Sequence, residues 1–121
     1  MSLRLFLCCA VILSSVAFGR ADDKSGSNTV FTGVITDSIC ARAGSHEEAM
    51  HMSKDMGKTA RECTIACVEK QGAKYVLYDP ASKKTYRISD QGRARKYAGE
   101  KVNITGMLKE NEIEVQSISA Q

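Results

Sequence analysis

The sequence predicts a mainly β protein of the α+β class, built as one small domain. Short runs rich in β-branched and aromatic residues recur along the chain, and turn-forming residues separate most of them. One stretch of helical periodicity with clear start and stop signals lies between the first run and the second. Together these features indicate a small sheet with helical connections.

Residues 1–21 have the features of a secretory signal peptide. Arg4 supplies the positive start, and Leu5 opens an apolar run. That run has about 13 residues, enough for a signal but short of the ~20 that span a bilayer. A cut after Ala21 satisfies the small-x-small rule. We therefore expect a secreted or periplasmic protein with no transmembrane segment after cleavage, in a compartment where disulfides persist.

Signal removal changes both the charge and the cysteine count. The full chain of 121 residues has 17 basic and 14 acidic residues and five cysteines. Two arginines and two cysteines belong to the signal, which leaves 15 basic against 14 acidic residues. Export and this near-neutral balance argue against nucleic-acid binding. Three cysteines remain: Cys40, Cys63 and Cys67.

The mature chain begins with a flexible polar lead-in, residues 22–28, and residues 29–121 form the single domain. Residues 29–36 are β-branched and predict a strand, in which Gly33 marks a bulge or a close approach. Residues 37–57 are irregular in pattern, with a short helix near 47–55. No second apolar stretch and no internal repeat follow.

The clearest helix spans residues 59–72. Thr59 and Glu62 have capping-box spacing, and Gly72 stands where a left-handed C-terminal cap is expected. At 100° per residue, Cys63 and Cys67 share one broad arc with several apolar residues. This arc predicts a buried side that includes both cysteines.

The rest of the chain predicts two hairpins separated by a short helix. Strands at 74–79 and 84–89 flank a turn that contains Pro80. Asp90 caps a basic helix at 91–98, which Gly99 ends. Strands at 101–108 and 112–119 follow, and a one-residue slip in the apolar alternation of the second predicts a bulge.

This element order matches that of a five-stranded OB-like barrel, with an inserted helix after strand 1 and a short helix between strands 3 and 4. The framework Asp37-Ser-Ile-Cys40 followed by Cys63-x-x-x-Cys67 resembles that of small exported bacterial proteins of unknown function. The resemblance covers residues 30–119 and implies an OB-like barrel and export. That group of proteins has no established activity, so the resemblance implies no substrate.

The three cysteines are the centre of the functional question. Cys63 and Cys67 are one helical turn apart, with Cβ atoms ~5–6 Å from each other. A disulfide needs ~3.5–4.5 Å, so we expect Cys40 to pair with one of them or with neither. Cys67 is the preferred partner because it lies nearer the middle of the buried arc. Such a bond closes a loop of about 28 residues and stabilises by roughly 3 kcal/mol. The protein would then be a binding or structural module with one inert thiol.

The alternative is a soft-metal site. His46, His51 and three methionines lie between the first cysteine and the other two. Thiolate and thioether ligands suit copper(I), and cysteine with imidazole suits zinc. The candidate ligands are Cys40, Cys63, Cys67 and one of the two histidines. The methionines also fit a helix that packs on the barrel, because methionine commonly fills gaps in cores.

Enzymatic activity is not expected. A redox thiol would need a depressed pKa, and no Cys-x-x-Cys motif accompanies the cysteines. Asp37 and Ser38 with a histidine supply the residue types of a hydrolytic triad, but no Gly-x-Ser-x-Gly motif surrounds Ser38. We interpret both as turn formers. The basic residues at 87–101 predict a solvated face; the partner is unknown, and an anionic envelope component remains a candidate.

Overall fold

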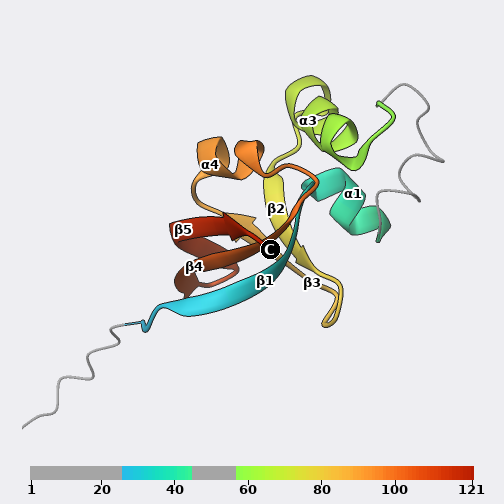
Figure 1. Ribbon diagram of the computed structural model, residues 1–121. Coiled ribbons are helices and arrows are strands. Elements are labelled where there is room, and N and C mark those ends of the chain that lie inside the picture. Colours follow the sequence, from blue (N-terminus) through green and yellow to red (C-terminus); the bar gives the residue numbers. More distant parts are fainter. Residues whose placement is uncertain (1–25, 45–56) are drawn as a thin grey trace, which may run out of the picture.

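A computed structural model describes residues 26–44 and 57–121 (Figure 1). Five strands form a mixed sheet that closes into a ring in the order β1-β2-β3-β5-β4, and β4 pairs again with β1. The α+β class and the helices after the first strand and between the third and fourth are confirmed. The elements are β1 (Thr29–Asp37), α1 (Ser38–Ala43), α3 (Ala60–Gln71), β2 (Tyr75–Asp79), β3 (Lys84–Ile88), α4 (Gln91–Lys96), β4 (Lys101–Lys109) and β5 (Glu112–Ala120).

The ring is not a regular barrel, because one of its seams is short. β3 and β5 run parallel and are joined through two residue pairs, Arg87 with Glu112 and Ile88 with Ile113. The other neighbours in the ring are antiparallel, and β4 and β5 form the longest ladder. The predicted signal peptide (1–21), the first part of the lead-in and the predicted helix at 47–55 lie outside the described residues.

β1 closes the ring because it changes partner along its length. Residues 29–34 pair with β4, and residues 34–37 pair with β2. Gly33 lies at this change, and a Cβ on it would collide with the backbone carbonyl of Tyr78 on β2. The predicted close approach at Gly33 is therefore confirmed.

The predicted bulge is confirmed in the β4–β5 hairpin. Thr105 pairs with Ser117 and the next residue, Gly106, pairs with Val115, so Gln116 on β5 has no opposite residue. The guanidinium of Arg93 donates a hydrogen bond of 2.9 Å to the Gln116 carbonyl. A side chain of α4 thus satisfies the carbonyl that the bulge releases from the ladder.

The core lies inside the ring and follows the alternation of the strands. Strand residues Ile35, Leu77, Val102, Ile104 and Ile113 are fully buried. α4 adds Ala94 to the same cluster, so this short helix packs on the ring interior. Leu108, which shares the inward alternation in the sequence, is 46% exposed near the end of β4.

The caps of α3 follow the sequence closely. The Thr59 hydroxyl accepts a hydrogen bond from the Glu62 amide at 3.1 Å, as the capping box predicts. The Glu62 carboxylate accepts from the amide of Lys58, one residue before the expected partner. Gly72 adopts the left-handed conformation with φ of 70° and ends the helix. α4 ends at Lys96, two residues earlier than predicted, with Tyr97 as its C-cap.

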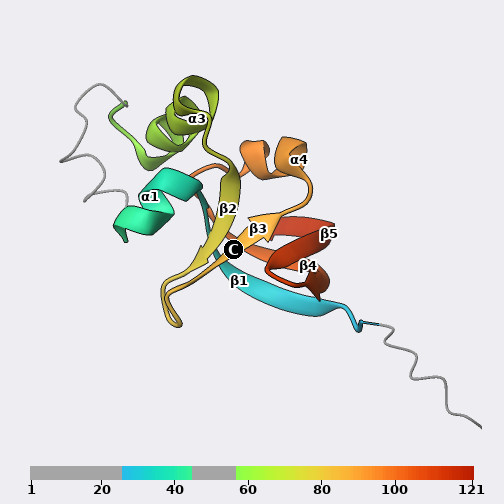
Figure 2. The same ribbon diagram turned by 180° about the vertical axis from the view of Figure 1, so that it is seen from behind.

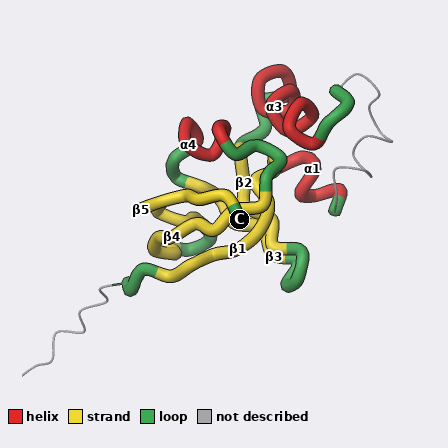
Figure 3. The backbone as a smooth tube through the Cα atoms, viewed as in Figure 1, coloured by secondary structure: helices red, strands yellow, loops and turns green. Residues whose placement is uncertain are grey.

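α1 corrects the interpretation of residues after the first strand. They were expected to be irregular, but Asp37 caps a helix that starts immediately after β1, and Gly44 ends it in the left-handed conformation. α1 and α3 lie side by side, and the described helices gather on one side of the strands (Figures 2 and 3). None of the described helices is both long enough and apolar enough to span a membrane.

Candidate metal centre at the three cysteines

Cys40, Cys63 and Cys67 form a second, smaller core between α1 and α3. Their exposed fractions are 1%, 1% and 4%, and Ala73 packs beside them. The Sγ atoms of Cys40 and Cys63 lie 3.8 Å apart. All three Sγ atoms lie within 4.8 Å of one another, and all three cysteines are free thiols. The structure therefore brings together every cysteine that the sequence predicted for the site.

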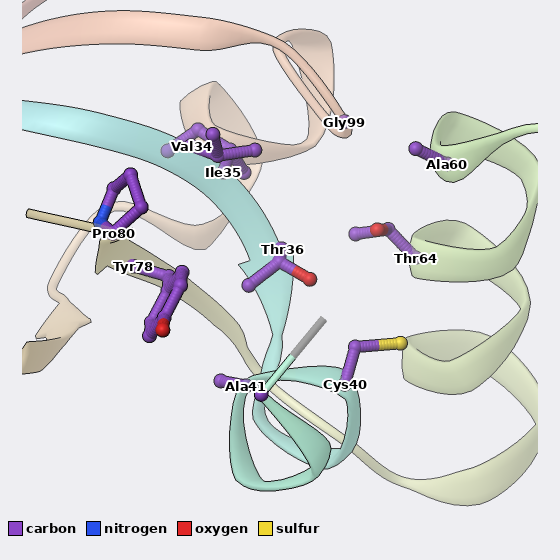
Figure 4. A pocket seen from close by; sticks show the side chains of 11 residues that line it. Val34, Ile35, Thr36, Cys40, Ala41, Ala60, Thr64, Tyr78, Pro80 and Gly99 are labelled. Atoms are coloured by element: carbon purple, nitrogen blue, oxygen red, sulfur yellow. The ribbon is translucent and has the colours of Figure 1, made fainter. Parts of the chain in front are cut away.

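Local structure explains why the sulfur atoms meet. α1 begins directly after β1, so Cys40 is held by the same turn that ends the strand. Figure 4 shows its sulfur atom pointing toward α3. Cys63 and Cys67 are one turn apart on α3 and so share the face that receives it. Two helices with a common packing face create the cluster.

Asp37, the N-cap of α1, is a buried polar residue three positions before Cys40. Its Oδ1 accepts hydrogen bonds from the amides of Ile39 and Cys40, both at 2.9 Å. The residue is fully buried, and Oδ2 has no hydrogen-bond partner among the described residues. Buried carboxylate oxygens are normally paired, so Oδ2 requires an explanation.

Asp37 was not among the site residues predicted from the sequence, because it was interpreted as a turn former. The available signal was its position. Asp37 is a typical N-cap residue, and Gly44, seven residues later, is a typical C-terminal residue of a helix. Together they predict a short helix between them. A capping Asp bonds the amide two or three residues on, which places its carboxylate next to Cys40.

The surroundings keep two of the thiols protonated when no metal is present. Burial raises the pKa of the Cys67 thiol to about 12, and the neighbouring Asp37 carboxylate adds to this effect. Burial is also the largest cause that raises the pKa of Cys40, and the nearby Asp37 carboxylate again adds to it. A nucleophilic thiol needs a lowered pKa, so Cys40 and Cys67 are poorly suited to redox catalysis. An ion that binds these sulfurs must displace their protons, so its affinity would depend on pH.

A cavity of about 290 Å³ meets the cluster at Cys40 (Figure 4). β1 and α3 contribute Thr36 and Thr64 to its wall, while Tyr78 and Pro80 lie on the opposite side. The lining is mainly apolar. Cys40 thus belongs both to the cysteine cluster and to the wall of this cavity.

Other predicted residues have structural contacts or lie outside the described part. His46 and His51 fall outside it. The Ser38 hydroxyl accepts a hydrogen bond from the Lys74 amide at 3.2 Å, which links α1 to the start of β2. In the basic segment, Arg93 pairs with Asp90 at 2.7 Å, and Arg95 pairs with Glu69. The side chains of both ion pairs are partly exposed.

A scan against protein-family models and searches of curated proteins and of solved structures find no match to this chain. The resemblance to small exported proteins therefore stays an expectation. Function is inferred from the cysteine cluster and the groups around it.

Proposed function

We propose that this protein binds a thiophilic metal ion, zinc or copper(I), through Cys40, Cys63 and Cys67. One observation carries the proposal: three buried sulfur atoms from two helices lie within 4.8 Å of one another. Thiolates are the preferred ligands of both ions. Burial keeps competing water away from such a site and makes each deprotonated sulfur dependent on a positive partner.

The sulfur spacing supports a metal more directly than a bond between sulfurs. Four ligands at ~2.3 Å around zinc place neighbouring sulfur atoms about 3.8 Å apart. The Cys40–Cys63 separation is 3.8 Å. A disulfide requires about 2.05 Å between the sulfur atoms, so these two thiols must move much closer before they can bond.

The proposed ion acts as a structural link. It joins α1, which continues from β1, to α3, which precedes β2, so it ties together the two ends of the connection between β1 and β2. Ligands that converge only in the folded state contribute their metal-binding free energy to folding. A domain of roughly 100 residues has a modest core, and such a link adds to its stability.

The finer assignment of the fold belongs to the same proposal. We infer an OB-like barrel, supported by the ring order β1-β2-β3-β5-β4, the parallel β3–β5 pair and α4 between β3 and β4. The proposed setting is an exported binding or structural module rather than an enzyme, on the basis of the signal-like residues 1–21.

A disulfide from Cys40 is the second candidate. The closeness of Cys40 to Cys63, on different helices, favours it, and an oxidising compartment would promote it. In that case the bond would serve the same purpose as the ion and link α1 to α3. Cys67, the partner preferred from the sequence, lies within the same 4.8 Å group.

Metal content and thiol count distinguish the two candidates. The full chain is expressed with its signal, purified without chelators, and measured by elemental analysis and by intact mass after alkylation under denaturing conditions. In the chain that has lost residues 1–21, and with them Cys8 and Cys9, a metal centre gives one zinc or copper per chain and three alkylated cysteines. A disulfide gives no metal and one alkylated cysteine. Cys63→Ser is the control, since it removes a ligand and should abolish stoichiometric metal binding.

A further inference from the structure

The cysteine cluster supplies three donors, and a tetrahedral ion takes four. Among the described residues, Asp37 is the one buried carboxylate, and its Oδ2 has no hydrogen-bond partner. We propose that Asp37 is the fourth ligand through Oδ2, and that the resulting set of three sulfurs and one oxygen selects zinc over copper(I). This inference rests on the proposed metal-binding function.

One oxygen of the Asp37 carboxylate is anchored by hydrogen bonds, as is common in metal-binding carboxylates. Its Oδ1 is fixed by the amides of Ile39 and Cys40 at 2.9 Å each, which leaves Oδ2 as the free oxygen. Ligating carboxylates are commonly held by such outer hydrogen bonds. One of the two anchoring amides belongs to Cys40, which is also a proposed sulfur ligand. The helix cap at Asp37 and the proposed metal site therefore share Cys40.

Asp37 is the N-cap of the helix that carries Cys40, although its carboxylate is not part of the group of three sulfur atoms within 4.8 Å. Its charge acts on the thiols of Cys40 and Cys67, which come from different helices. For an ion bound between these two sulfurs to reach Oδ2, the Asp37 carboxylate must approach the sulfur cluster. Coordination would supply the buried oxygen with the partner that it lacks in the described structure, and so remove the cost of leaving it unpaired.

The charge of the ligand set favours a divalent ion. Three thiolates and one carboxylate supply four negative charges, which zinc reduces to two and copper(I) reduces to three. A structural zinc site with four cysteines has the same residual charge of about two. Because buried charge is costly, the divalent ion is the better fit. Copper(I) is satisfied by three thiolates and gains little from a hard carboxylate oxygen.

The test compares Asp37→Asn with a matched variant, Asp90→Asn. Both residues are N-caps of six-residue helices, and asparagine is an equally good cap, so each substitution keeps its helix start while it removes a carboxylate. Asp90 accepts its cap hydrogen bond from Arg93 on α4, away from the cysteines. The reduced chain, after removal of the signal residues that contain Cys8 and Cys9, is titrated without oxygen. The ions are cobalt(II), zinc against a competing chelator, and copper(I) against another.

We expect Asp37→Asn to weaken zinc and cobalt(II) binding at least ~10-fold and to change the visible spectrum of the cobalt form. Copper(I) affinity should stay within about threefold of the parent, because the three sulfur ligands remain. Asp90→Asn should match the parent for all three ions. A His46→Ala/His51→Ala variant should also match it, since Asp37 then fills the position that a histidine would take.

Different outcomes overturn different claims. If Asp37→Asn binds zinc as the parent does, or if only the histidine variant loses zinc, Asp37 is not the fourth ligand. The proposed metal binding is not affected by either result. Equal loss of zinc and copper(I) in Asp37→Asn shows that Asp37 only supports the cluster, and this also overturns the inference. No binding of any ion by the reduced parent chain overturns the proposed function.

Discussion

Cys40 and Cys63 belong to different helices and are 23 residues apart, yet their Sγ atoms lie 3.8 Å from each other. Cys63 and Cys67 share one helix, where side chains one turn apart have Cβ atoms ~5–6 Å from each other. Cys40 is therefore the thiol through which any bond within the cluster must form. The chemistry of oxidation follows from this asymmetry.

Oxidation of the metal-free protein should form one disulfide per chain, and it should always contain Cys40. Cys67→Ser should still form the Cys40–Cys63 bond, whereas Cys40→Ser should keep two alkylatable thiols after mild oxidation, since an intact helix holds Cys63 and Cys67 too far apart. Peptide mapping by mass spectrometry after alkylation identifies the bonded pair. A substantial Cys63–Cys67 disulfide would contradict the prediction and would imply that α3 unwinds.

A side chain completes the hydrogen bonding of β2 at its first residue. The amide oxygen of Gln91 accepts from the Tyr75 amide at 2.8 Å, and its nitrogen donates to the carbonyls of Tyr75 and Ile88 at 2.9 Å each. Gln91→Ala removes three hydrogen bonds and leaves part-buried backbone groups unpaired. It should lower the free energy of unfolding by about 1–3 kcal/mol in urea denaturation.

Gln71→Ala is the matched control for Gln91→Ala. Gln71 is exposed in the last turn of α3, and its side chain makes no hydrogen bond with a described residue. Its replacement should change the free energy of unfolding by no more than ~0.5 kcal/mol. Equal effects of the two variants would show that the contacts of Gln91 with β2 do not contribute to stability.

Features that depend on neighbours in sequence were predictable. Thr59 caps the start of α3 and Gly72 ends it, and both were predictable because capping involves groups close together in the sequence. The bulge near Gln116 was predictable from a slip in the apolar alternation of β5. In a strand, apolar residues face the core and polar residues face solvent, so the pattern shows where the alternation shifts. The same local pattern placed Cys63 and Cys67 on a buried face.

Features that depend on distant segments were not predictable to the same depth. The parallel seam at Arg87 and Glu112 joins strands separated by α4 and β4, and no local pattern specifies that pairing. The free oxygen of Asp37 is similar. Capping explains Oδ1, but the burial of Oδ2 depends on how α3 packs against α1. Sequence alone identified the cysteines and missed the carboxylate beside them.

Asp90 should contribute a pH-dependent part of stability in acid. The backbone amide of Arg93, and then its guanidinium, hold the pKa of Asp90 below its ordinary value of 3.8. A lowered folded-state pKa stabilises the fold above the unfolded value, and this contribution is lost as the pH falls through the lower, folded value. Asp90→Asn keeps the cap but removes the titrating group, so stability should fall less steeply below about pH 4.

Thermal unfolding between about pH 6 and about pH 2 measures this effect. Glu100→Gln is the control, because Glu100 is an exposed carboxylate whose side chain makes no hydrogen bond with a described residue. Its acid profile should follow that of the parent. If Asp90→Asn also follows the parent, the ion pair with Arg93 does not persist in solution.

Two glycines should respond to alanine with opposite signs. A Cβ on Gly106 would collide with the backbone carbonyl of Glu114 across the β4–β5 bulge, and neither strand can yield without breaking the ladder. Gly106→Ala should therefore destabilise the protein by about 1–3 kcal/mol. On Gly92 in α4 the new Cβ would meet only Asp90 Oδ1, at 3.7 Å.

Gly92→Ala should stabilise the protein by about 0.5–1 kcal/mol, because alanine loses less backbone freedom in a helix and the space is open. Urea denaturation of both variants, with the metal state held constant, measures the two shifts in midpoint against the parent. Destabilisation by Gly92→Ala would mean that α4 is not helical at this residue. A neutral Gly106→Ala would mean that β4 and β5 are less closely paired at the bulge, where Arg93 binds the released carbonyl of Gln116.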